Sequence, residues 1–291
     1  MTLVSAIVPS IGSAGTVGGT SRTFVVDSVG SVLATANVDL EVIVVAGREM
    51  PSAVTDALQA LGPQVRLVDY QHAFNFSAVV NLGAAHATGE YLLLLNDDTE
   101  VITPDWLTRM LEACGPGVGA VGAKLLFEDG TLQHAGHTYR TSLDHVGFGL
   151  PGDSAGRNGL LSRRREVAGV TAACMLTPSA VFDAVGGFSV LLPGNYNDVD
   201  YCMKLRMAGW SIVYEPAAAL YHFESQSRVA GIHPEEIELI QRRWLTNLID
   251  DPFTPAAVQI CAPERTLDDV LSANAHYEAV RADDDPDLAT T

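Results

Sequence analysis

Apolar residues recur along the first third of the chain in two alternating patterns. Short continuous runs rich in β-branched residues and leucine, such as LEVIVVA at 40–46, are typical of strands buried on both faces. Between them, apolar residues return every three or four positions, as in amphipathic helices. Strands are predicted at 3–9, 40–46, 65–68 and 91–95, and helices at 21–36, 50–61 and 77–87. This alternation predicts an α/β fold with a mostly parallel central sheet flanked by helices.

The pattern changes after Pro104. Helices are predicted at 105–114, 178–185, 199–208 and 234–249, and strands at 119–127, 167–177 and 210–214. We expect one domain over 1–232, a helical extension over 233–282 and a disordered acidic tail over 283–291. The glycine-rich segment 12–19 lacks the GxGxxG spacing of a dinucleotide site, so a flexible loop is expected there.

Charge and composition narrow the range of functions. The formal net charge of -18 argues against a nucleic-acid partner, because phosphates would be repelled over much of the surface. No apolar run is long enough to cross a bilayer, and the N-terminus lacks the features of a signal peptide. The four cysteines have no close pair, which fits reduced thiols in the cytoplasm.

A run of four leucines ends in two adjacent carboxylates in LLLLNDDTEV at 92–101. Bare charge is costly in a buried strand, so Asp97 and Asp98 should reach water or hold a cation. Ligands of parallel sheets bind beyond the carboxyl ends of the strands, where these residues fall. Mn²⁺ and Mg²⁺ prefer such oxygen ligands. A solvated turn is the alternative, since Asn and Asp are common in turns.

Two later segments add candidate chemistry. Asp198 and Asp200 stand at the start of the predicted helix 199–208, where one carboxylate is enough for capping. His222 follows a predicted strand in a loop that is rich in acidic and hydroxyl residues. A lone histidine is more often structural than a ligand, so its position alone does not decide its role.

Five segments in order resemble family 2 glycosyltransferases of the GT-A fold, especially bacterial rhamnosyltransferase-like enzymes of surface polysaccharides. They are FNFSAVVNLGAAHATGEYLLLLNDDTEVITPDWL, GAVGAKLLFEDGTLQHAG, VTAACMLTPSAVFDAVGGF, NDVDYCMKLRMAGW and YHFESQSR, and they span about 74–228. Each segment alone is a weak signal, but five in the family's order make a strong match.

The resemblance implies roles for the matched positions. Asp98 and His222 would hold Mn²⁺ or Mg²⁺, and Asp198 would be the catalytic base. The donor, a dTDP- or UDP-linked sugar, would contact Pro9, Ser10, Asn75, Asn81, Asn96, Asp97 and Arg228. The acceptor would contact Gly187, Asn197 and Asp200.

The same resemblance implies a function. Residues 1–103 would bind the donor nucleotide and residues 104–232 the acceptor. The reaction would be an inverting transfer of a sugar to a hydroxyl of a glycan or a lipid-linked acceptor in cell-surface polysaccharide synthesis. A peripheral contact with the inner face of the membrane and a homo-oligomer are left open.

The chain departs from the family at 44–49, where VVAGRE replaces an Asp-rich turn, and at Asn197, which replaces a Glu. Glu49 is a candidate substitute for the missing carboxylate.

Other interpretations remain open at this point. A non-catalytic relative that only binds sugar nucleotides would explain both departures. The sequence Gly152-Asp-Ser154-Ala-Gly156 matches the GxSxG pattern of serine hydrolases, which requires a preceding strand and a following helix. His134 and His137 are spaced as a metal pair can be, although structural or acceptor-side roles account for them as well. The basic run at 163–165 is a solvated face or an attraction point for phosphorylated acceptors.

Overall fold

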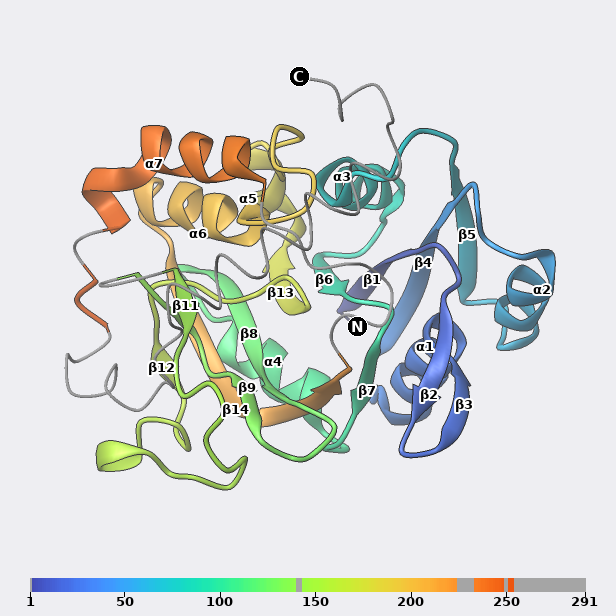
Figure 1. Ribbon diagram of the computed structural model, residues 1–291, viewed down its shortest axis with the longest axis horizontal. Helices are drawn as coiled ribbons and strands as arrows, with labels where there is room; N and C mark the ends of the chain where they lie inside the picture. Colours follow the sequence, from blue (N-terminus) through green and yellow to red (C-terminus); the bar gives the residue numbers. More distant parts are fainter. Residues whose placement is uncertain (1, 140–142, 224–232, 249–250, 254–291) are drawn as a thin grey trace, which may run out of the picture.

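One large mixed sheet forms the centre of the protein, and helices cover both of its faces (Figure 1). The computed structural model describes residues 2–139, 143–223, 233–248 and 251–253. The strands of the main sheet follow the order β12-β14-β8-β13-β6-β1-β4-β5, with β7 paired to β14 and β9 to β8. They are β1 (Leu3–Ser10), β4 (Asp39–Gly47), β5 (Val65–Tyr70), β6 (Tyr91–Leu95), β7 (Thr99–Val101), β8 (Val118–Leu126), β9 (Leu132–His134), β12 (Arg165–Glu166), β13 (Cys174–Pro178) and β14 (Ser211–His222).

The two faces of the sheet explain the continuous apolar strands. Successive side chains of a strand point to opposite faces, so a strand covered on both sides must be apolar at every position. Leu93 and Leu95 pack with helices α1 (Phe24–Thr35), α2 (Ser52–Ala60) and α4 (Trp106–Ala113). Leu92 and Leu94 pack on the other face with α3 (Phe76–His86), α5 (Ser179–Ala184) and α6 (Asn197–Met207). The four leucines are therefore all core residues, and the polar residues begin where the strand ends.

Strands β6, β1, β4 and β5 run parallel to one another. Their carboxyl ends consequently lie along one edge, where Ser10 at the end of β1 meets the residues that follow β6. Strand β13 is antiparallel to both β6 and β8. Strand β14 is parallel to β8, with a register shift between Glu215 and Ala219. Its last residue, His222, pairs with Thr99 of β7, which places it next to Asp98.

Two predicted elements near the N-terminus differ from the observed ones. The segment 12–19 is not a flexible loop, because β2 (Ala14–Val17) and β3 (Thr20–Thr23) form an antiparallel hairpin there. Gly18 and Gly19 form its turn with φ of 57° and 79°, the left-handed conformation that two-residue hairpin turns need. The helix predicted at 21–36 accordingly begins only at Phe24.

The predicted strands at 167–177 and 210–214 also have other bounds. Only 174–178 forms a strand in the first segment, and the buried residues before it form a connection that runs toward the cavity described below. The second strand continues as β14 to His222, past Pro216 at the register shift. The apolar pattern gave wrong bounds for two different reasons. The residues before Cys174 are mostly buried but do not pair as a strand, and β14 continues to pair beyond a bulge.

The C-terminal part contributes one described helix, α7 (Pro234–Leu248), close to the predicted 234–249. The predicted extension beyond residue 253 and the acidic tail lie outside the described residues. Among the described helices, none has both the length and the hydropathy needed to cross a membrane.

Candidate functional site

A cavity of about 530 Å³ opens at the carboxyl edge of the parallel strands. Its walls come from segments far apart in the chain: the ends of β1 and β6, the start of α6 and the end of β14. Of the residues predicted for the site, the cavity is lined by Pro9, Ser10, Asn96, Asp97, Asp98, Asn197, Asp198 and His222. The structure therefore brings together the three side chains that the sequence proposes for metal and proton chemistry.

Asp98 and His222 form a close buried pair. Asp98 Oδ1 lies 3.1 Å from His222 Nε2, and the two residues are only 4% and 9% exposed. On its other side, His222 Nδ1 lies 2.6 Å from Gln133 Oε1, which can only accept. Nδ1 therefore carries a proton, and Nε2 is the ring nitrogen that faces Asp98. Metal-binding histidines are commonly oriented in this way by a partner on the second ring nitrogen.

Asp97 faces the same edge but has a different environment. Its Oδ2 accepts a hydrogen bond of 2.6 Å from Ser10 Oγ, which in turn accepts one from the Gly12 N–H. Burial and, after it, the charge of Asp98 raise the pKa of the Asp97 carboxyl to about 7, against smaller opposing influences of the Ser10 hydrogen bond and His222. Two adjacent buried carboxylates thus repel each other in the absence of a cation.

The side chains around Asp98 fit a divalent cation. Asn96 Oδ1 is buried and has no hydrogen-bond partner among the described residues, while its Nδ2 lies 3.1 Å from His222 Nε2. Carboxylate oxygen, amide oxygen and one imidazole are ligands that Mn²⁺ and Mg²⁺ accept, with remaining positions left for water or phosphate. The mutual repulsion of the two carboxylates favours such an ion as well.

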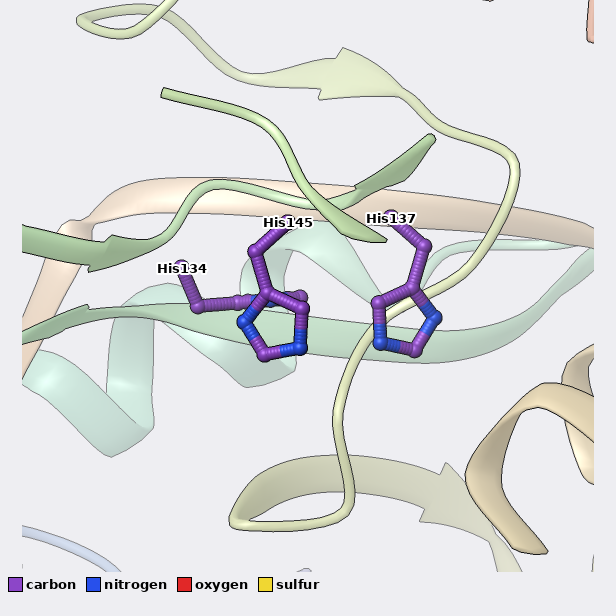
Figure 2. Close-up of side chains that lie close together, drawn as sticks. All are labelled: His134, His137 and His145. Atoms are coloured by element: carbon purple, nitrogen blue, oxygen red, sulfur yellow. The ribbon is translucent and has the colours of Figure 1, made fainter. Parts of the chain in front are cut away.

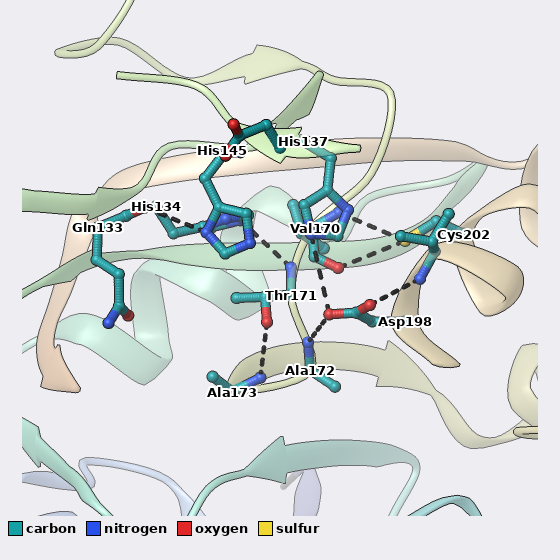
Figure 3. A network of polar contacts seen from close by, with 12 residues as sticks. Gln133, His134, His137, His145, Val170, Thr171, Ala172, Ala173, Asp198 and Cys202 are labelled. Carbon is teal, nitrogen blue, oxygen red and sulfur yellow. Dashed lines mark hydrogen bonds and ion pairs between the residues drawn. The ribbon is translucent and has the colours of Figure 1, made fainter. Parts of the chain in front are cut away.

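Asp198 also lines the cavity, at the start of α6 (Figure 3). Its Oδ1 accepts a hydrogen bond of 2.8 Å from the Val199 N–H, and its Oδ2 accepts one of 3.3 Å from the Ala172 N–H. His137 Nε2 lies 3.9 Å from Oδ2. The side chain is 17% exposed, so it is fixed in orientation but still reaches the cavity. An ionised carboxylate also suits this position because the N-terminal end of a helix carries partial positive charge.

Four predicted contact residues lie away from the cavity and serve the fold. Asn75 caps α3 by accepting from the Ala78 N–H, and its Nδ2 donates to the Val190 carbonyl. Asn81 exchanges two hydrogen bonds of 2.8 Å with the backbone of Phe188. The roles predicted for Asn75 and Asn81 in donor binding are not supported, because their amide groups are used within the chain.

Gly187 and Asp200 are the other two predicted contact residues that lie away from the cavity. Gly187 has a φ of 59°, and a Cβ there would lie 2.7 Å from Asn81 Oδ1, so this glycine is needed for the turn. Asp200 is 1% exposed, and its Oδ1 accepts from Arg243 Nη1 and Trp244 Nε1 of α7 at 2.9 and 2.8 Å. The predicted acceptor contacts of Gly187 and Asp200 are therefore replaced by structural roles. Arg228 lies outside the described residues.

Sequence reasoning missed several residues of the cavity wall. They include Phe74, Phe76, Gln133, His145, Tyr196 and the backbone of 171–173. The segment QHAGHTY carried the only usable signal, since two histidines and a glutamine stand close together in it. Glu49, the candidate substitute for the missing carboxylate after the second strand, does line the cavity.

Two of the sequence alternatives, the serine hydrolase and a phosphate-attracting basic run, find no support in the site. Ser154 lies in a connection between short elements, and neither a strand precedes it nor an α-helix follows it. It is also absent from the cavity wall. In the basic run, Arg164 is paired with Glu215, and Arg165 donates to the carbonyls of Leu160 and Ala135. These two cations are thus used within the chain.

Glu236 of α7 holds one segment of the cavity wall in place. Its carboxylate is 2% exposed and accepts three hydrogen bonds of 2.8–3.0 Å, from the Gly194 N–H, the Asn195 N–H and Asn195 Nδ2. These bonds hold the segment 194–196, which lines the cavity and includes Tyr196 with a φ of 57°. A left-handed φ in a residue other than glycine has to be held by its surroundings.

We expect Glu236→Ala to lower the free energy of unfolding by about 3 kcal/mol, because buried donors left without a partner cost roughly 1–3 kcal/mol each. Denaturant unfolding measures this change. Glu238→Ala, an exposed position of the same helix, is the matched control and should stay within about 0.5 kcal/mol of wild type. Equal effects of the two substitutions would show that the hydrogen bonds of Glu236 contribute nothing particular.

Comparison with solved structures gives the class of the fold. GalNAc-T7, crystallised with UDP, GalNAc and Mn²⁺, superposes with a TM-score of 0.61 at 9% identity, over 86% of this chain and 49% of that one. The mannosyltransferase PcManGT from Pyrobaculum calidifontis, in complex with GDP-Man and Mn²⁺, gives 0.54 at 16% identity over 96% and 80%. TarS from S. aureus gives 0.57 at 14% identity over 88% and 41%. The predicted GT-A fold is thereby confirmed.

The family follows from the sequence comparisons. A family model described as "Glycosyltransferase like family 2" matches residues 20–247. The chain belongs to this family, as its resemblance predicted. The match extends through most of α7, and the domain boundary placed at 232 stays a prediction.

Two relatives are considerably closer in sequence than the solved structures. The uncharacterized protein y4gI of Sinorhizobium fredii is 42% identical over 200 residues, which cover 65% of this chain and 22% of the relative. The O-antigen biosynthesis protein RfbC of Myxococcus xanthus is 36% identical over 205 residues, which cover 68% and 16%. The chain thus spans less than a quarter of the length of either relative.

Proposed function

We propose that this chain transfers a sugar from a nucleoside-diphosphate donor to an acceptor hydroxyl, with inversion and with the help of a divalent metal. The observation that carries the proposal is the placement of Asp98, His222 and Asp198 on the walls of one cavity. Family membership supports sugar transfer as the reaction type. Two structures with the same fold contain a nucleotide or a nucleotide sugar together with Mn²⁺.

Asp98 and His222 would hold the metal ion, with Asn96 beside them. When bound, Mn²⁺ or Mg²⁺ supplies positive charge that stabilises the departing nucleoside diphosphate. Gln133 orients the ring of His222 so that Nε2 faces Asp98. A cation held there would let a chain with a net charge of -18 bind an anionic donor.

Asp198 would take the proton from the acceptor hydroxyl as this hydroxyl attacks the anomeric carbon. The backbone N–H groups of Val199 and Ala172 fix the two oxygens of its carboxylate. A single displacement needs one base on the acceptor side and no second nucleophile, and it inverts the configuration. General-base assistance of this kind contributes about 10²–10⁴-fold.

Glu49 is our candidate for contact with the donor nucleoside. It follows β4 directly and lines the cavity on the side of Pro9 and Ser10. A carboxylate there can accept hydrogen bonds from ribose hydroxyls or base N–H groups. It would replace the Asp-rich turn that family members carry at this point.

The acceptor is proposed to be a glycan or a lipid-linked glycan of the cell surface. The name of the Myxococcus relative, an O-antigen biosynthesis protein, supports polysaccharide assembly as the context. Both dTDP-rhamnose and UDP-sugars are donors to be tested, with the reaction placed in the cytoplasm.

A screen of nucleotide sugars tests the proposal. With Mn²⁺ or Mg²⁺ present, one donor at about 100 times its Kd should stabilise the native state by roughly 2.7 kcal/mol, which raises Tm. The donor that stabilises the protein should also be hydrolysed slowly, with metal-dependent release of the nucleoside diphosphate. Stabilisation without release would favour the non-catalytic relative instead. If no nucleotide sugar raises Tm in the presence of either metal, the proposed function is wrong.

A further inference from the structure

Three histidine side chains gather on the wall of the cavity beside Asp198. Each ring of His134, His137 and His145 offers one nitrogen, and these nitrogens lie within 4.8 Å of one another. Figure 2 shows the rings of His137 and His145 next to each other in front of the ring of His134. The ring centroids are 4.7–5.2 Å apart. His137 and His145 line the cavity, and His134 lies fully buried behind them.

The backbone brings these residues together from three short strands. His134 ends β9, and His137 of β10 (His137–Thr138) pairs directly with His145 of β11 (Asp144–His145). Gly136 makes the bend between β9 and β10 with a φ of 99°, and a Cβ there would lie 2.9 Å from Val167 Cγ1. Only glycine fits both conditions, so the bend that gathers the imidazoles is specified by the sequence.

Hydrogen bonds to the second ring nitrogens orient two of the rings (Figure 3). His145 Nδ1 lies 3.1 Å from the Gln133 carbonyl, so Nδ1 donates and Nε2 keeps its lone pair. His137 Nδ1 lies 3.0 Å from the Tyr139 hydroxyl, which can accept in the same way. A backbone carbonyl or another acceptor on the remote nitrogen is the usual support of a metal-binding histidine.

His134 is the incomplete member of the network. Its Nε2 accepts only a long hydrogen bond of 3.3 Å from the Thr171 N–H. Its Nδ1 is buried and has no hydrogen-bond partner in the described part of the chain. A buried polar atom without a partner is rare and costly. Because a neutral imidazole has only one lone pair in the ring plane, a metal ion on this ring would replace the long hydrogen bond from Thr171.

Burial lowers the pKa of two of the three histidines. Burial lowers the pKa of His137 to about 4, against a smaller opposing influence of Asp198. Burial lowers the pKa of His134 well below its usual range, and the neighbouring histidines and Arg165 lower it further. Burial of this kind disfavours the charged form of an imidazole.

We propose that His134, His137 and His145 form a second metal site, which takes a zinc-type transition metal ion. Imidazole nitrogens suit Zn²⁺ and its neighbours, whereas the carboxylate and amide oxygens around Asp98 suit Mg²⁺ and Mn²⁺. Three protein ligands leave at least one coordination position open, as in reactive zinc sites. That position faces the cavity, where a water molecule or an acceptor hydroxyl would occupy it. This inference goes beyond the proposed function and does not depend on it.

Cobalt substitution of the full chain tests the site. Four-coordinate Co²⁺ bound to imidazoles absorbs intensely in visible light, and six-coordinate Co²⁺ in an oxygen-rich site absorbs weakly. We expect the metal-free protein to give the intense band with one equivalent of Co²⁺, and one equivalent of Zn²⁺ to remove it. His145→Ala should weaken binding by about 100-fold or more, because even loss of a supporting hydrogen bond costs roughly 10–100-fold.

Three variants test whether the cobalt band comes from the histidine cluster, from the site at Asp98 or from an exposed histidine. Asp98→Ala should retain the band, because its carboxylate belongs to the other site, and His86→Ala removes an exposed histidine of α3 and should retain it too. His145→Gln keeps a polar side chain and serves if His145→Ala does not fold. The proposal is overturned if wild type gives no intense band, if the band survives both His145 substitutions, or if Asp98→Ala abolishes it.

Discussion

Asp198→Asn is expected to lower the rate of sugar transfer by about 10²–10⁴-fold, with little change in donor affinity. The amide has nearly the shape of the carboxylate, and its oxygen can still accept from the Val199 or the Ala172 N–H. What it cannot do is take a proton from the acceptor hydroxyl. Initial rates with saturating donor and acceptor measure the loss, and donor-dependent thermal stabilisation measures binding.

Asp183→Asn is the matched control for this substitution. Asp183 lies on α5, is exposed and does not line the cavity, so its loss should change the rate less than twofold. A rate for Asp198→Asn within tenfold of wild type would remove Asp198 from the role of base. Loss of donor binding in the same variant would instead indicate that the carboxylate acts on the donor.

Asp98→Asn is expected to abolish the metal-dependent part of donor binding. The roughly 2.7 kcal/mol of stabilisation expected at 100 times Kd should fall to what the donor provides without metal. The reason is that Asn replaces a charged ligand by a neutral one next to His222, whose Nε2 lies 3.1 Å from the carboxylate. Thermal unfolding with donor, in Mn²⁺ and in a chelator, gives the difference directly.

The control here is Asp105→Asn, an exposed carboxylate beyond the strand end that pairs only loosely with Arg109 at 3.7 Å. Surface pairs of this kind contribute little. The metal-dependent shift should persist in it undiminished. Its persistence in Asp98→Asn as well would mean that the cation binds elsewhere in the cavity.

The sequence predicted the location of the candidate site best where local pattern and fold coincide. A run buried on both faces must end in polar residues where it leaves the core, and parallel strands bring such ends to one edge. Asp97 and Asp98 follow from this argument alone. Asp198 lies at a helix start, which also orients its carboxylate in a predictable way.

Other positions could not be predicted because their roles depend on distant partners. Asp198 and Asp200 are two residues apart on a helix, so their side chains diverge by about 200° and only one can face the cavity. No local feature of the sequence shows that Arg243 and Trp244 donate hydrogen bonds to the carboxylate of Asp200. The two-residue strands that carry His137 and His145 are likewise too short to leave a periodic signal.

The register shift in β14 has a consequence for how this chain can vary in length. Residues 216–218 stand between the pairs Glu215–Ala123 and Ala219–Lys124, and Thr103 holds them through Ala217 and Ala219. Because alternate residues of a strand point in opposite directions, one deleted residue here would turn Tyr221 or Phe223 toward Asp98 in place of the imidazole. The number of residues in this short detour is thus as much a requirement of the proposed cation site as the histidine itself.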